Sequence, residues 1–319
     1  MPNYSGIWSL SQQFQAVGQG LWPPNYVETE TFAIFALGAA PSRSTTRNKY
    51  TYSGDTVGSA TAATIASRYG SAAGNATVGI FALGETTTFS GVTTRDKYTY
   101  SGCVVSAGGA ATLASFDGSA AGNSTVGIFA LGNDNSAGTA RNKYTYSGDV
   151  VAAGGAATQA SRQGSAAGNS TVGIFALGKN VNTTNATRNK YTYSGDTVGS
   201  ATAATAGSYY GSATGNSTFG VFALGAADGC AALVTRNKYT YSGCVVAAAT
   251  AATVASFQGS AAGNSTVGIF ALGLNAAFCR LTTRNKYTYS GCVVSAGGAA
   301  TAASNGGSAA SNGTTGVNT

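Results

Sequence analysis

The chain has 319 residues and a formal net charge of +7, but only 8% of its residues are charged. Its 46 glycines dominate together with alanine, serine and threonine, while 17 tyrosines and 13 phenylalanines recur in register. This aromatic and β-branched content excludes a disordered chain and predicts a globular, β-rich protein. No run of 18 apolar residues occurs, so no membrane-spanning helix is expected.

Residues 1–30 precede everything that repeats and contain both tryptophans of the protein. The segment lacks the basic start and the continuous apolar core of a secretory signal. Trp8, Phe14 and Trp22, followed by Pro23, indicate an N-terminal docking arm, because aromatic anchors commonly dominate interfaces. The alternative is that this segment packs on its own domain.

Two motifs alternate from Thr31 onward. IFALG or a near copy occurs six times, and KYTYSG follows each copy. The phenylalanines of successive first motifs lie 46 to 48 residues apart, which gives a repeat of about 47 residues. A fixed period of this length indicates a solenoid or a propeller, and we expect one repeat domain over residues 31–319.

Each repeat predicts four strands, as the copy that starts at Arg68 illustrates. Residues 69–74 form a strand of small residues, 77–84 an apolar strand buried on both faces, 96–101 an alternating strand with two tyrosines on one face, and 103–112 a last strand. The aromatic residues of the two middle strands are expected to pack between blades rather than to form a sugar platform. They are Phe81, Tyr98, Tyr100, Phe129, Tyr144, Phe175, Tyr191, Phe222, Tyr239, Phe270 and Tyr287.

This order of strands resembles the kelch motif. Arg68 and Arg162 match the arginine that opens kelch repeats, and each second strand ends in glycine. The glycine is single rather than paired, and valines such as Val57 replace the usual tryptophan of the fourth strand. The resemblance implies that each repeat forms one blade of a β-propeller.

The two ends of the repeat domain complement each other. The first repeat lacks its strand of small residues, whereas residues 307–316 align with residues 259–268 of the last full repeat. The C-terminal strand is therefore expected to complete the first blade. The expected fold is an all-β, six-bladed kelch-like propeller closed by that strand, with an extended N-terminal arm.

Most of the basic residues belong to an Arg-x-Lys motif that recurs in every repeat. A propeller would display them as a basic ring that attracts phosphate or anionic glycan. The alternative is that they are solvated positions copied by repeat duplication. The twelve residues are Arg47, Lys49, Arg95, Lys97, Arg141, Lys143, Arg188, Lys190, Arg236, Lys238, Arg284 and Lys286.

No residue pattern predicts a catalytic, metal or cofactor site. The chain has no histidine and no CxxC spacing. Cys103, Cys244 and Cys292 share one repeat position with aspartates of the other copies, a position typical of a turn. Equivalent positions in different blades lie too far apart for a disulfide, so all five cysteines are expected to be free.

Asn-Ser-Thr follows the first strand in four repeats. We expect a turn there rather than glycosylation, with asparagine favoured for its positive φ. The four asparagines are Asn123, Asn169, Asn216 and Asn264.

The loops between the second and third strands are where the repeats differ most. All of them should emerge on one face of the ring, which makes this face the candidate binding surface. The five loops are residues 85–94, 133–140, 179–187, 226–235 and 274–283.

The segment YSGIWSLSQQFQAVGQGLWP resembles the short arms that open tail-associated structural proteins of bacteriophages, and the KYTYSG repeats are similar to phage virion sequences. The residues that carry the likeness are Gly6-Ile7-Trp8, the run 12–15 and Trp22-Pro23. The resemblance implies a non-enzymatic virion protein, assembled in the host cytoplasm as a tail fibre, tail-tip or decoration component. Its implied partners are other virion proteins through the arm, and a host-surface glycan or protein through the propeller. Nucleic acid is not an expected partner, and no membrane span is expected.

Two alternatives remain open. The first is a bacterial cell-surface or intracellular propeller that binds proteins or glycans. The second is a glycan-active enzyme on the same fold.

Overall fold

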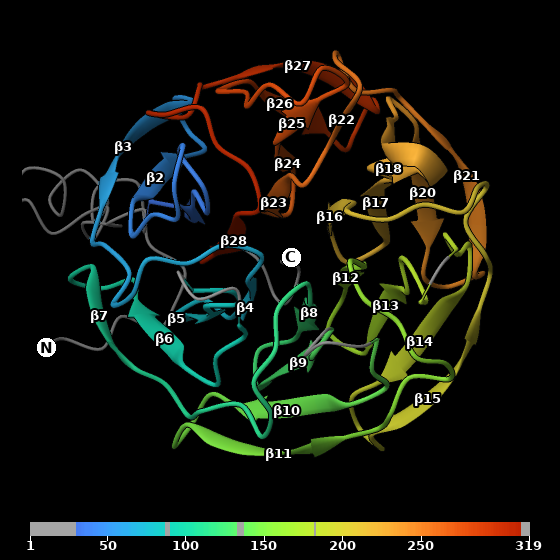
Figure 1. Ribbon diagram of the computed structural model, residues 1–319, viewed down its shortest axis with the longest axis horizontal. Helices are drawn as coiled ribbons and strands as arrows, with labels where there is room; N and C mark the ends of the chain where they lie inside the picture. The colour runs from blue at the N-terminus through green and yellow to red at the C-terminus, as the bar shows by residue number, and fades with distance from the viewer. Residues whose placement is uncertain (1–29, 87–89, 133–136, 182, 314–319) are drawn as a thin grey trace, which may run out of the picture. The chain divides into compact units, whose positions relative to one another are not determined.

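The computed structural model describes residues 30–86, 90–132, 137–181 and 183–313. The blades belong to one compact unit that begins at Thr31. Six four-stranded antiparallel sheets surround a common axis, with their first strands innermost and their fourth strands outermost (Figure 1). The predicted all-β, six-bladed propeller is therefore confirmed. Within the described ranges, no helix has the length and apolar character needed to cross a membrane.

The strands of each blade follow one another from the axis outward. Blade 1 consists of β28 (Ser308–Ser311), β1 (Phe32–Ala36), β2 (Arg47–Thr51) and β3 (Thr56–Ala60). Blade 2 consists of β4 (Ser71–Gly74), β5 (Val78–Ala82), β6 (Arg95–Thr99) and β7 (Val104–Ala107). Blade 3 consists of β8 (Ser119–Gly122), β9 (Val126–Ala130), β10 (Arg141–Thr145) and β11 (Val150–Gly154).

Blade 4 consists of β12 (Ser165–Gly168), β13 (Val172–Ala176), β14 (Arg188–Thr192) and β15 (Thr197–Ala201). Blade 5 consists of β16 (Ser212–Gly215), β17 (Phe219–Ala223), β20 (Arg236–Thr240) and β21 (Val245–Ala249). Blade 6 consists of β23 (Ser260–Gly263), β24 (Val267–Ala271), β26 (Arg284–Thr288) and β27 (Val293–Gly297). The loops add two short ladders and a 3-10 turn, which are β18 (Ala226–Ala227) with β19 (Ala231–Ala232), β22 (Ser256–Phe257) with β25 (Leu274–Asn275), and η1 (Asp228–Cys230).

The C-terminal strand completes the first blade, as the sequence predicts. β28 pairs antiparallel with β1, with Ala309 opposite Phe35. Beyond the strand, the Phe32 N–H donates to Asn312 Oδ1 at 2.7 Å, and the Asn312 N–H donates to the Phe32 carbonyl at 3.1 Å. The ring is therefore closed by a sheet that combines the two ends of the repeat domain.

The first and last strands of a blade are shorter than the sequence suggests. β4 begins at Ser71 because Tyr69 has a φ of +57° and its N–H bonds to another blade. β7 ends at Ala107 because the chain then crosses to the next blade, where the Thr112 N–H donates to Asn142 Oδ1 at 3.1 Å. Contacts between blades therefore end these strands. The sequence pattern of one repeat does not reveal such contacts.

The core lies between adjacent blades rather than inside any one of them. Successive residues of a second strand point to opposite faces, so Ile80 of blade 2 packs on blade 3 while Phe81 packs on blade 1. On the blade 3 side, Phe129 and Tyr144 cover Ile80. Each apolar strand is thus buried on both faces, which explains its lack of polar alternation.

The glycine that ends every second strand is required by both conformation and space. Gly84 has a φ of +73°, a region that glycine adopts without steric cost. A Cβ there would lie 2.5 Å from the carbonyl oxygen of Arg68. This glycine thus allows the loop to pass against the residues that precede the inner strand.

The asparagine turns are present, but their predicted physical reason is wrong. No asparagine of these turns is among the residues with positive φ in the described ranges. Instead, Asn123 Oδ1 accepts hydrogen bonds from the N–H groups of Thr125 and Val126, both at 2.9 Å. Its Nδ2 donates to the Ser170 carbonyl of the next blade at 3.1 Å. Asparagine is used because its side chain caps the turn and links neighbouring hairpins.

Candidate functional site: the axial ring and loop face

The six repeats differ most at one end of the propeller. The loops between second and third strands vary, and so does the residue two positions before each inner strand. These six residues surround the axis, and we call them the axial ring. The axial ring is Tyr69, Asp117, Gln163, Tyr210, Gln258 and Gly306. The end of the unit that carries this ring and the variable loops is the loop face.

The backbone of the axial ring forms a closed cycle of hydrogen bonds. Each N–H donates to the carbonyl of the counterpart in the preceding blade, at 2.7 to 3.0 Å. The cycle includes the bond from the Tyr69 N–H to the Gly306 carbonyl, which joins blade 2 to the C-terminal part of blade 1. The ring therefore holds its six residues in fixed positions around the axis.

All six residues have a positive φ between 54° and 64°. Such a conformation costs about 1–3 kcal/mol for a residue other than glycine. Gly306 shows that glycine fits the position, and there a Cβ would meet the Tyr69 ring at 2.7 Å. The other five blades nevertheless carry large polar or aromatic residues. Their side chains, rather than the backbone, must account for these residue types.

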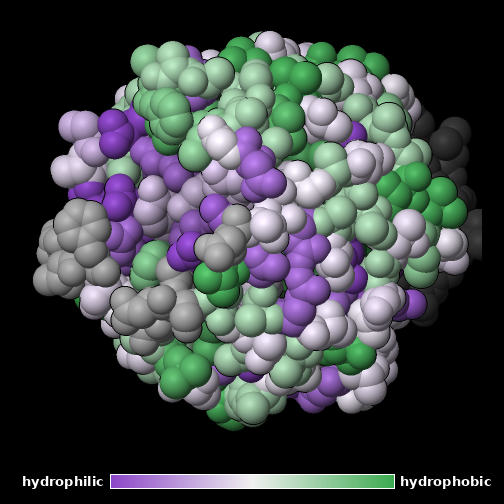
Figure 2. Space-filling view, turned by 45° about the vertical axis from the view of Figure 1, so that its right-hand side comes forward, coloured by the Kyte–Doolittle hydropathy of each residue, from purple (hydrophilic) through white to green (hydrophobic). Residues whose placement is uncertain are grey.

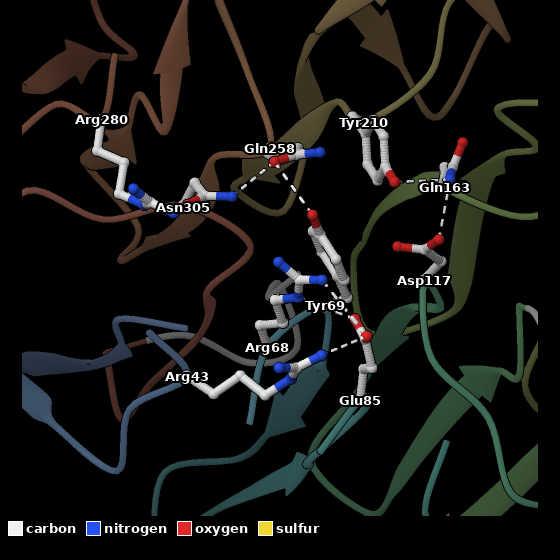
Figure 3. Close-up of polar contacts among 10 residues, drawn as sticks. All are labelled: Arg43, Arg68, Tyr69, Glu85, Asp117, Gln163, Tyr210, Gln258, Arg280 and Asn305. Atoms are coloured by element: carbon white, nitrogen blue, oxygen red, sulfur yellow. Dashed lines mark hydrogen bonds and ion pairs between the residues drawn. The ribbon is translucent and has the colours of Figure 1, made fainter. Parts of the chain in front are cut away.

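One half of the ring is a chain of polar contacts that starts at a buried carboxyl group. Gln163 Nε2 donates to Asp117 Oδ2 at 2.9 Å and to the Tyr210 hydroxyl oxygen at 2.7 Å (Figure 3). Asp117 is only 6% exposed, and its Oδ1 has no hydrogen-bond partner among the described residues. Burial raises the pKa of Asp117 to about 6, against the opposing effects of Gln163 and Arg162.

The other half of the ring combines aromatic stacking with carboxamides. The rings of Tyr69 and Tyr210 stack with centroids 5.8 Å apart. The Tyr69 hydroxyl lies 3.5 Å from Gln258 Oε1, which also accepts a 2.7 Å hydrogen bond from Asn305 Nδ2 (Figure 3). Asn305 Oδ1 in turn accepts from Arg280 Nε at 2.7 Å.

An ion-pair cluster borders Tyr69. Glu85 lies between Arg43, at 2.6 Å, and Arg68, at 2.8 Å, and the Arg68 guanidinium stands over the Tyr69 ring at 4.6 Å (Figure 3). Burial tends to raise the pKa of Glu85, but the hydrogen bonds from Arg68 and Arg43 outweigh it and lower that pKa below its ordinary value. Glu85 therefore binds both guanidinium groups as a carboxylate, through charge-assisted hydrogen bonds.

The surface at this end is polar near its centre. In Figure 2, turned by 45° from the view of Figure 1, hydrophilic residues gather across the middle of the visible surface, with weakly polar and apolar residues around them. Within the described ranges, no group of three or more potential metal ligands occurs. Carboxamides, aromatic rings, guanidinium groups and the carboxyl groups of Asp117 and Glu85 equip the site for binding by hydrogen bonds and stacking.

The six arginines of the expected basic ring are buried, which corrects the expected display to solvent. Arg188 Nη2 donates to Asn237 Oδ1 of the next blade at 3.3 Å, and its guanidinium stacks over Phe222 at 4.6 Å. The same arrangement recurs at every blade interface, except that Asp96 replaces the asparagine as the partner of Arg47, at 2.7 Å. Burial lowers the pKa to about 10 at the five asparagine interfaces, which involve Arg95, Arg141, Arg188, Arg236 and Arg284.

The six lysines of the motif are half-buried, and three of them, Lys97, Lys143 and Lys286, form ion pairs with an aspartate of a neighbouring blade. Lys97, for example, pairs with Asp149 of the following blade at 2.9 Å. Asp149 has a φ of +55° in its turn and also accepts the Tyr144 hydroxyl at 2.7 Å. Cys103, Cys244 and Cys292 occupy the same left-handed turn position in the other blades, and all five cysteines are free.

The remaining predicted residues have clear positions where the structure describes them. The eleven aromatic residues expected to pack between blades are all buried. The docking-arm residues Trp8, Phe14, Trp22 and Pro23 lie outside the described residues. The variable loops join second to third strands, so their described residues lie together at the loop face.

Sequence reasoning missed the axial ring. The kelch resemblance drew attention to the position of Arg68 and Arg162, which is one residue earlier. The sequence nevertheless contained a signal for the axial ring. The residue type at this position differs between repeats, although the glycine that follows it and the strand of small residues after that glycine hardly change. No protein-family model matches the chain, and no curated protein matches it.

Proposed function

We propose that the chain is a non-enzymatic binding protein whose propeller presents the loop face to a partner. The observation that carries this proposal is the placement of variation. Packing positions repeat almost unchanged, while the differences gather in the axial ring and the loops beside it. A rigid scaffold with divergent residues at one end is the arrangement in which binding loops are commonly found.

In its specific form, the proposal is a bacteriophage virion component with kelch-related blades: a tail fibre, tail-tip or decoration protein. The sequence resemblance of the N-terminal arm supports this form. The arm would attach the protein to other virion proteins through Trp8, Phe14 and Trp22, and the loop face would contact the host surface.

The test distinguishes attachment to the particle through the N-terminal arm from folding of the propeller and its loop face. Deleting residues 1–28 should leave the β-sheet circular dichroism and the melting temperature unchanged, because every described blade is complete without them. The same deletion should abolish incorporation into particles, and Trp8→Ala with Trp22→Ala should weaken it. Phe278→Ala on the loop face is the matched control and should assemble normally. Normal assembly of the deletion variant would refute mounting by the arm.

A second candidate is a bacterial surface or intracellular propeller that binds proteins or glycans. The axial ring supports this candidate as much as the virion form. Its polar and aromatic side chains are suited to binding a ligand, whether or not the protein is part of a virus particle. Immunogold electron microscopy of purified particles distinguishes the two: label on particles supports the virion form, and label confined to cells supports the alternative.

A further inference from the structure

A row of four aromatic side chains lies at the loop face, where Phe278 is exposed, Tyr69 and Tyr210 are partly buried, and Phe257 is buried at 3% exposure. It starts at Phe278 in the blade 6 loop and continues through Phe257 and Tyr210 to Tyr69 beside the axis. Successive ring centroids are 5.7, 6.4 and 5.8 Å apart. Tyr69 ends the row against the guanidinium of Arg68. We call these four residues the aromatic row.

Phe278 is the most unusual member of the row. Its side chain is 59% exposed, and its φ is +58°. A positive φ is a genuine outlier for a bulky residue. An exposed phenylalanine also loses the favourable free energy of burying its apolar surface. The turn is held by the Phe278 N–H, which donates to the Asn275 carbonyl at 3.0 Å, and by Asn275 Oδ1. Two unfavourable features at one residue point to a role in contact with a ligand.

Positive charge accompanies the aromatic row. The repeated Arg-x-Lys motif contains twelve of the 17 basic residues, and the other five all lie on the loop face. Lys179 Nζ stands 5.2 Å from the centroid of Tyr209, whose ring lies 5.2 Å from that of Tyr210. The acidic side chains described on this face are Glu85, Asp117 and Asp228. The five basic residues are Arg43, Arg68, Arg162, Lys179 and Arg280.

Resting on the proposed binding function, we infer that the loop face binds an anionic saccharide on the accessible members of the aromatic row, Phe278, Tyr210 and Tyr69. The apolar C–H face of a sugar ring packs on an aromatic ring, whose face carries negative charge density. The partly buried Tyr69 and Tyr210 offer hydroxyl groups to sugar hydroxyls, and Lys179 and the nearby guanidinium groups attract its carboxylate or phosphate. Five basic residues against three described acidic residues leave a positive balance on this face, which favours an anionic saccharide over a neutral one.

Calorimetry on the full-length protein tests the inference with three probes at low ionic strength. They are an oligomer of a uronic acid, the matching oligomer with its carboxyl groups reduced to alcohols, and a phosphorylated oligosaccharide. At least one anionic probe should bind 10-fold or more tightly than the neutral one. Which anionic probe binds identifies carboxylate or phosphate as the source of charge. Equal affinity for all three probes, or binding of none, would overturn the inference.

Variants then locate the site. Phe278→Ala and Lys179→Gln should each weaken binding of the preferred probe about 10-fold, a loss of about 1.4 kcal/mol. Val150→Ala is the matched control, because Val150 is 57% exposed on the outermost strand of blade 3, and it should bind normally. Unchanged affinity in Phe278→Ala would refute a site on the aromatic row.

Adsorption of the protein to host cells, measured in parallel, separates this inference from the proposed function. If Phe278→Ala loses adsorption while the wild-type protein binds no saccharide probe, the loop face is a binding surface for another ligand class. That result would refute the saccharide inference and keep the proposed function. If the wild-type protein binds saccharide but does not adsorb to the host, the proposed function fails instead.

Discussion

Buried arginines show how one repeated residue joins six blades. Each guanidinium donates to the side chain of the next blade and lies over a phenylalanine, so the bonds close around the ring. Arg188 also shows the cost, since burial lowers its pKa to about 10. Loss of a hydrogen-bond acceptor for a buried guanidinium group is costly, because an unpaired charge in the interior is strongly destabilising.

The acceptor is therefore the sensitive partner. Asn237→Ala removes the acceptor of Arg188 and should lower the free energy of unfolding by about 3 kcal/mol. Asp96→Asn is the matched control, since it gives Arg47 the partner found at the other five interfaces, and it should change stability by less than about 1 kcal/mol. Denaturant titration measures both variants. An Asn237→Ala variant as stable as the wild type would show that the hydrogen bond contributes little.

At the scale of the element, β28 does more than fill an empty edge. It pairs with β1, and its Ala309 and Ala310 pack into the cores on both sides of blade 1. The chain just before it supplies Gly306, which closes the hydrogen-bond cycle of the axial ring. One short strand thus stabilises a sheet, two blade interfaces and the centre of the loop face.

Removing residues 305–319 tests this closure. The truncated chain should melt at a lower temperature and aggregate, because β1 would expose an unpaired edge. Asn312→Ala, which removes the 2.7 Å hydrogen bond from the Phe32 N–H, is a mild comparison and should cost about 1 kcal/mol. Light scattering during a thermal melt records both effects. A truncated protein that stays monodisperse with the full-length melting temperature would contradict closure by β28.

For the whole molecule, tyrosine burial sets the response to alkaline pH. The second tyrosine of each KYTYSG motif is buried, and burial raises its pKa well above the ordinary value near 10. These six are Tyr52, Tyr100, Tyr146, Tyr193, Tyr241 and Tyr289. Because the folded pKa exceeds the unfolded one, their contribution to stability is complete below about pH 10 and is lost as pH rises further.

The buried arginines act in the opposite direction. Their folded pKa of about 10 lies below the ordinary value for arginine, so they favour folding increasingly as pH rises above about 10. Tyrosines with raised pKa outnumber them, so net stability should fall above about pH 10. Tyrosinate absorbance should then rise together with loss of the β-sheet circular dichroism signal. A rise in absorbance with unchanged circular dichroism would show that the tyrosines titrate inside the folded propeller.

Local patterns in the sequence were sufficient for the blades and for their closure. The second and third strands were predicted from residues that are close together in the sequence: the apolar run that contains Phe81 and the alternation around Tyr98 and Tyr100. Closure was predicted from repetition, because residues 307–316 align with an earlier repeat. The burial of Arg188 could not be predicted from the sequence, because a charged residue is normally exposed to solvent. Only the neighbouring blade provides Asn237 and Phe222, which contact its guanidinium group.

The axial ring depended on tertiary structure still more strongly. Its hydrogen bonds join one residue from each of six blades, and Tyr69 meets Gly306 only when the two ends of the repeat domain share a sheet. Likewise, Phe278, Tyr210 and Tyr69 come from three different repeats, and closure of the ring brings them onto one face. Sequence periodicity predicts what each repeat forms, whereas contacts between repeats arise from the geometry of the closed ring.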